Sequence, residues 1–119
     1  MSSGCEKLAG SVLLLTGLML VSACKTTAEY TAEEAPLWTR PDNSAGDFAV
    51  DRKACVDYVE LALYEESWVS PIIRMSAAER YAEASWWAGR EYVACMQEKG
   101  WQPAQGARIP TPRDISYPF

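Results

Sequence analysis

The pattern of hydrophobic and polar residues divides this chain into an apolar start, a polar stretch, two amphipathic stretches and a proline-rich end. The apolar start runs from Leu8 to Ala23, sixteen residues without a charged side chain. A helix needs about 20 apolar residues to cross a bilayer core, and glycine, serine and threonine interrupt this run. Its length is instead typical of the hydrophobic part of a signal peptide.

The first amphipathic stretch, from Asp47 to Trp68, predicts a helix with Asp47 as its N-cap. Its charged residues, Arg52 among them, are assigned to a solvated face. Its apolar face is predicted from residues at helical spacing: Phe48, Cys55, Val59 and Ala62, widened by Ala54, Tyr58 and Leu61.

The second amphipathic stretch predicts a helix from Ala77 to about Lys99. Ser76 and Glu79 have the spacing of a capping box, and Gly100 is typical of the residue that follows a helix end. The predicted inner face of this helix consists of Tyr81, Ser85, Ala88, Tyr92 and Cys95.

These patterns predict a mainly α fold, an antiparallel helical hairpin over residues 47–101. Residues 24–46 are polar and lack an apolar period, so they predict a flexible tether. Within it, Leu37 and Trp38 either dock on the domain or await a partner. Residues 102–119 contain four prolines and predict an extended, partly disordered tail. Residues 1–23 would be the signal peptide.

The residues Val21-Ser22-Ala23-Cys24, preceded by Leu20, resemble the lipobox of bacterial lipoproteins. The resemblance implies that Cys24 is lipidated, that cleavage falls before it, and that acyl chains hold the protein on a membrane. Because an Asp after the cysteine retains enterobacterial lipoproteins in the inner membrane, Lys25 implies the outer membrane. The domain would then face the periplasm or the cell surface. The alternative is an uncleaved N-terminal helix that ends at a buried cysteine.

Cys55 and Cys95 remain as an even pair in an exported chain, so we predict a structural disulfide between the two helices. The alternatives are a redox switch and, less favoured, a soft-metal site of Cys95 and Met96. Met75 is midway between the two cysteines. Either the first helix continues to about Ser70, or residues 71–75 form a helical turn of their own, which we favour.

Composition excludes several kinds of function. A net charge of −5 without a basic block disfavours nucleic-acid binding, and a chain with no histidine lacks the commonest metal ligand and general base. We therefore expect no metal and no cofactor. The best acid/base candidates, Glu79 and Glu83, are one helical turn apart and are typical of a solvated helix face, so we predict no catalytic residue and no enzyme activity.

The segments "RKACVDYV" and "YVACMQEKGW" resemble small uncharacterised helical lipoproteins and periplasmic proteins of bacteria. This resemblance covers the helical half of the chain and implies a fold rather than an activity. The C-terminal Tyr117-Pro118-Phe119 also resembles peptides that PDZ domains of periplasmic proteases bind, although a loose chain end is the simpler interpretation.

Trp86 and Trp87 are candidate partner-binding residues. Neighbouring helical residues point about 100° apart, so both cannot face the same helix. One is expected to pack in the core and the other to be covered by another segment or a partner. We predict a structural or protein-interaction accessory lipoprotein. A redox or envelope-stress sensor that uses Cys55 and Cys95 is the alternative, and resistance of the disulfide to glutathione would distinguish the two.

Overall fold

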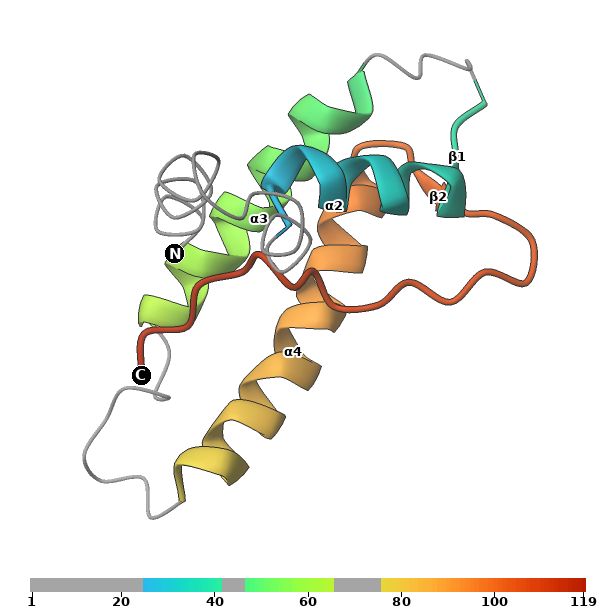
Figure 1. Cartoon of the computed structure of the whole chain (residues 1–119). Coiled ribbons are helices and arrows are strands. Elements are labelled where there is room, and N and C mark those ends of the chain that lie inside the picture. Colours follow the sequence, from blue (N-terminus) through green and yellow to red (C-terminus); the bar gives the residue numbers. More distant parts are fainter. Residues whose placement is uncertain (1–24, 42–46, 66–75) are drawn as a thin grey trace, which may run out of the picture.

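The computed structural model describes residues 25–41, 47–65 and 76–119 (Figure 1). The predicted signal peptide and Cys24 lie outside the described residues, and so does the predicted turn at 71–75. Among the residues described, no helix combines the length and the apolar character required to cross a membrane.

Two long helices dominate the structure, α3 (Phe48–Glu65) and α4 (Ala77–Glu98). They run in opposite directions, with the end of α4 beside the first half of α3 (Figure 1). A disulfide joins Cys55 to Cys95, with the two Cα atoms 5.7 Å apart. The prediction of a mainly α, disulfide-linked helical hairpin is therefore confirmed. Closing this loop constrains the unfolded chain by about 4 kcal/mol in the entropic model.

The buried face of α3 is rotated from the predicted one. Tyr58 and Leu61, assigned to the apolar face, are 51% and 62% exposed, whereas Arg52, assigned to solvent, is buried. Most of the buried residues follow one another at intervals of three or four, so they form a single stripe along the helix. Arg52 lies on this stripe between Phe48 and Cys55. The buried residues of α3 are Phe48, Arg52, Cys55, Val56, Val59 and Leu63.

Helix α4 has the predicted bounds within one residue. The Ser76 hydroxyl accepts a hydrogen bond from the Glu79 amide at 3.1 Å. At the other end, Gly100 has a φ of 96° and Trp101 donates its amide to the Met96 carbonyl at 3.1 Å. This is a Schellman motif, which requires a left-handed residue. It turns Trp101 back into the core beside Met96, where both are buried.

The inner face of α4 also departs from the predicted set. Ala88 and Tyr92 are buried as predicted, whereas Ser85 and Cys95 are only partly buried. Tyr81 is 55% exposed, while Ala84, nearly one turn further along, is fully buried. The buried residues of α4 are Ala84, Ala88, Tyr92 and Met96. Tyr81 packs instead against Tyr117 of the tail, with ring centroids 4.9 Å apart.

The segment predicted as a flexible tether contains a third helix, α2 (Thr27–Glu34), followed by the 3₁₀ helix η2 (Ala35–Leu37) and strand β1 (Trp38–Thr39). The Thr26 hydroxyl caps α2 by accepting from the Glu29 amide at 3.2 Å. Strand β1 pairs antiparallel with β2 (Gln102–Pro103), and Trp38 is buried in the core. The prediction missed α2 because its buried residue is a glutamate, so the helix has no apolar stripe.

The proline-rich tail is extended, as predicted, but it is ordered against the hairpin rather than partly disordered. After β2 it loops away and returns across α4 and α3 (Figure 1). Ile115 is buried, and Ser116 donates its amide to Glu60 of α3 at 2.7 Å. A Cβ on Gly89 of α4 would overlap the Thr111 hydroxyl, so the tail approaches where α4 lacks a side chain.

Candidate functional site

A cluster of polar side chains lies buried where four segments of the chain meet. Glu34 ends α2, Arg52 belongs to α3, Tyr92 to α4, and Asp114 to the tail. The Arg52 side chain is only 2% exposed and the Glu34 side chain 6%. We call Glu34, Arg52, Tyr92, Asp114 and Trp38 the buried junction.

Arg52 is the centre of the junction because it binds both acids. Its Nη1 and Nη2 donate to the two carboxylate oxygens of Asp114 at 2.9 and 2.8 Å. Its Nε donates to Glu34 Oε1 at 3.2 Å. The planar guanidinium therefore forms a two-pronged pair with one carboxylate and uses its remaining edge for the other, which a lysine ammonium does not reproduce.

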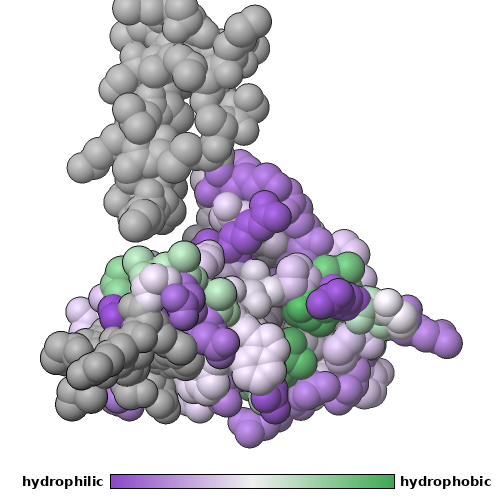
Figure 2. All heavy atoms as spheres, turned by 90° about the horizontal axis from the view of Figure 1, so that it is seen from below, coloured by the Kyte–Doolittle hydropathy of each residue, from purple (hydrophilic) through white to green (hydrophobic). Residues whose placement is uncertain are grey.

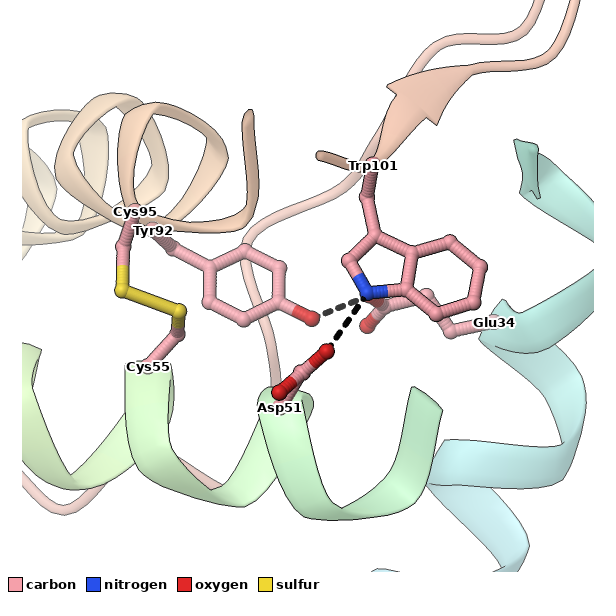
Figure 3. Close-up of a disulfide and its surroundings, with 6 residues drawn as sticks. All are labelled: Glu34, Asp51, Cys55, Tyr92, Cys95 and Trp101. Atoms are coloured by element: carbon pink, nitrogen blue, oxygen red, sulfur yellow. Dashed lines mark hydrogen bonds between the residues drawn. A yellow bond between two sulfur atoms is a disulfide. The ribbon is translucent and has the colours of Figure 1, made fainter. Parts of the chain in front are cut away.

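Two acids share one cation, so the junction carries one uncompensated negative charge. Neutral donors stabilise it. Trp38 Nε1 donates to Glu34 Oε2 at 2.8 Å, and the Tyr92 hydroxyl donates to the same oxygen. Figure 3 shows Tyr92 next to the disulfide, with its ring between Cys95 and the Glu34 carboxylate. The charge of Glu34 is thus solvated by protein donors in place of water.

Tyr92 and Arg52 of the buried junction keep their protons at neutral pH. Burial, and then the charge and hydrogen bond of Glu34, raise the pKa of the Tyr92 phenol well above its ordinary value. Burial alone would lower the pKa of Arg52, but the hydrogen bonds to Asp114 and the charges of both acids raise it. Because Tyr92 stays protonated and Arg52 stays charged at neutral pH, neither exchanges protons as an acid/base catalyst does.

A second polar contact joins the start of α3 to the turn after α4. Trp101 Nε1 donates to Asp51 of α3 at 2.9 Å, as Figure 3 shows. The guanidinium of Arg40 lies 5.3 Å from the Trp101 ring and 3.5 Å from Asp51. Phe48 packs edge-on against Trp101 with ring centroids 5.2 Å apart. These contacts fix the turn after α4 against the start of α3.

The predicted cysteine pair lies inside the fold. Cys55 is fully buried and Cys95 is partly buried. Because thiol–disulfide exchange needs access to a sulfur, this burial hinders attack at Cys55. In the described part of the chain, no cluster of three or more metal-ligating side chains is present.

The two tryptophans that were predicted to bind a partner have different environments. Trp87 is half-buried and packs against the core, whereas Trp86 is 61% exposed. Arg90, one turn further along α4, places its guanidinium 4.8 Å from the Trp86 ring centroid. Glu79 and Glu83 are both exposed on α4.

Two hollows are candidates for binding. A cavity of about 300 Å³ lies between α2 and the tail, above the buried junction, and its floor is Glu34 and Arg52. These two residues already use their hydrogen bonds on each other and on the junction. A wider groove of about 410 Å³ lies between α4 and the tail. It is lined by Trp86, Gly89, Arg90, Val93, Ala94, Gln97, Arg108, Ile109 and Thr111.

The sequence prediction missed the buried junction, although one signal for it was present. Arg52 lies four residues after Phe48 and three before Cys55, so it occupies a position of the predicted apolar stripe. Its charge led to the opposite assignment. Nothing in the local pattern indicated Asp114, because the tail lacks periodicity.

Comparisons with protein-family models, curated proteins and solved structures found no match for this chain. Its function must therefore be inferred from the geometry of the described residues.

The buried junction makes a prediction for stability. Replacing Arg52 with Met would leave two buried carboxylates without their cation, so we expect a loss of about 3–5 kcal/mol in the free energy of unfolding. Lys53→Met is the matched control. This neighbouring cation forms an exposed pair with Asp57 at 2.7 Å, and such pairs contribute little. Urea unfolding of both variants measures the difference, and similar small losses would contradict the central role of Arg52.

Proposed function

We propose that this protein is a non-catalytic lipoprotein of the cell envelope that acts as a structural or protein-interaction accessory subunit. The observation that carries the proposal is Trp86, a large aromatic side chain that is exposed beside a groove. The rest of the domain is held together by the disulfide and the buried junction. Tryptophan is a preferred anchor of protein interfaces. A fixed scaffold lowers the entropy that such a contact costs on binding.

One face of the molecule offers small rather than broad apolar areas to a partner. The face in Figure 2 is mainly hydrophilic, with small hydrophobic patches separated by polar side chains. A partner that binds such a surface relies on a few well-placed anchors, and the groove beside Trp86 provides one.

The anchor on Cys24 would hold the domain close to the membrane. Only Lys25 and Thr26 separate Cys24 from the first residue of α2. At about 3.3 Å per residue, the start of α2 would stand roughly 10 Å from the lipidated residue. The predicted long tether is therefore replaced, in this proposal, by a short link to a folded domain, which suits a partner at the membrane surface.

The lipid anchor makes a direct prediction. The mature protein should carry acyl chains on a peptide that begins at Cys24, and it should partition into detergent. A Cys24→Ser variant should keep its first 23 residues, because lipidation precedes cleavage in the pathway that the lipobox implies. Mass spectrometry of the N-terminal peptide measures both outcomes. A native protein that still begins at Met1 would contradict the anchor.

The Trp pair provides the test of partner binding. Trp86→Ala should leave the melting temperature unchanged but weaken binding to the envelope partner by about 2 kcal/mol or more. Trp87→Ala should instead lower the melting temperature, because its ring packs against the core. The two variants control each other, with co-purification from detergent-extracted membranes as the binding measurement. If Trp86→Ala retains every partner of the wild type, the interaction proposal fails.

A further inference from the structure

The groove between α4 and the tail combines apolar walls with positive charge. Val93, Ala94 and Ile109 form its apolar lining, and Trp86 stands at its edge. Arg90 and Arg108 are the charged residues of the lining, and no Asp or Glu belongs to it. In a chain with a net charge of −5, this is a local reversal of the overall sign.

Neither arginine has an acidic partner within the described residues. Arg90 lies over the Trp86 ring, which holds its guanidinium in place while leaving its N–H groups free to donate. Arg108 is exposed on the opposite wall, which the tail supplies. Two cations therefore face the same groove from two segments that are brought together only by folding.

The tail wall is fixed in position. The Thr111 hydroxyl donates to the Ser85 carbonyl at 3.2 Å, and Asp114 binds Arg52 a few residues further on. On the α4 side, Gly89 admits the tail at close range. Because the tail is fixed against α4, both walls of the groove are in place before a ligand binds. Binding therefore costs little conformational entropy in the protein.

Resting on the proposed function, we propose that this groove binds an extended acidic segment of the envelope partner. Arg90 and Arg108 bind carboxylates of that segment, and Trp86 covers an apolar side chain between them. A guanidinium forms two parallel hydrogen bonds with a carboxylate, which gives direction as well as attraction.

The experiment uses the full chain in nonionic detergent and a labelled peptide of about eight residues that alternates glutamate with leucine, long enough to span the groove as an extended strand. The matched probe replaces each glutamate with glutamine. The proposal predicts saturable binding of the acidic peptide, at least about tenfold tighter than the glutamine peptide, and weaker binding as salt rises. Equal binding of the two peptides, or no binding of either, would overturn the proposal.

Charge-reversed variants locate the binding. Arg108→Glu should weaken binding of the acidic peptide by about tenfold or more. Arg113→Glu makes the same charge change on an exposed tail residue outside the groove and should bind within about twofold of the wild type. Arg108→Lys, which retains the charge, should recover part of the loss. Melting temperatures confirm that each variant is folded. Equal effects of Arg108→Glu and Arg113→Glu would show a general charge effect and overturn the assignment to the groove.

Vesicles with and without phosphatidylglycerol test whether the groove binds lipid instead of a protein segment. If Arg108→Glu abolishes vesicle binding while peptide binding is unchanged, the groove binds lipid headgroups and the proposal is wrong. Co-purification distinguishes failure of the acidic-segment proposal from failure of the proposed function. A partner lost on Trp86→Ala but kept on Arg108→Glu contradicts only the acidic segment, whereas a partner kept on both contradicts the proposed function.

Discussion

The fold depends on one buried cation, the Arg52 guanidinium, and on the acceptors that satisfy its hydrogen bonds. Removing a guanidinium from water costs several kcal/mol, and the cost is offset only when its donors are satisfied with good geometry. Arg52 meets this condition with two carboxylates from distant parts of the chain, Glu34 and Asp114. Glu34 receives only one hydrogen bond from Arg52 and in turn requires neutral donors, which Trp38 and Tyr92 provide. Satisfying Arg52 therefore fixes α2, α4 and the tail around α3.

The disulfide and the buried junction connect different parts of the fold. The Cys55–Cys95 bond joins the two long helices and limits the freedom of the unfolded chain. It leaves α2 and the tail unattached. The junction lies about one helical turn away on both helices, at Arg52 and Tyr92, and attaches those two segments. A two-helix hairpin buries little surface alone, so the covering segments complete the core with Trp38 and Ile115.

The sequence was informative where structure is set locally. Periodicity and capping residues predicted α3 and α4, and the cysteine pair predicted their connection. The sequence was misleading where a polar group replaces an apolar one in the core. Helix α2 is held by Glu34, so it has no hydrophobic stripe, and the tail is held by Asp114, which no periodic pattern surrounds. Such contacts depend on three-dimensional pairing of charges, which spacing along one segment does not reveal.

This architecture has a consequence for function. The groove beside Trp86 has one wall from α4 and another from the tail, and the tail is positioned by the same Arg52 that positions α2. The shape of the groove therefore depends on the buried junction, although none of the junction residues lines the groove. A partner that binds the groove would recognise the folded state of the whole domain.

The most direct test of the central role of Arg52 is a double-mutant cycle between Glu34→Gln and Asp114→Asn. The two residues come from opposite ends of the described chain and share Arg52 as their common partner. If Arg52 unites them, the losses in free energy of unfolding should be non-additive by about 0.5–3 kcal/mol. Losses that add within about 0.3 kcal/mol would show independent contacts and would contradict the central role of the buried junction.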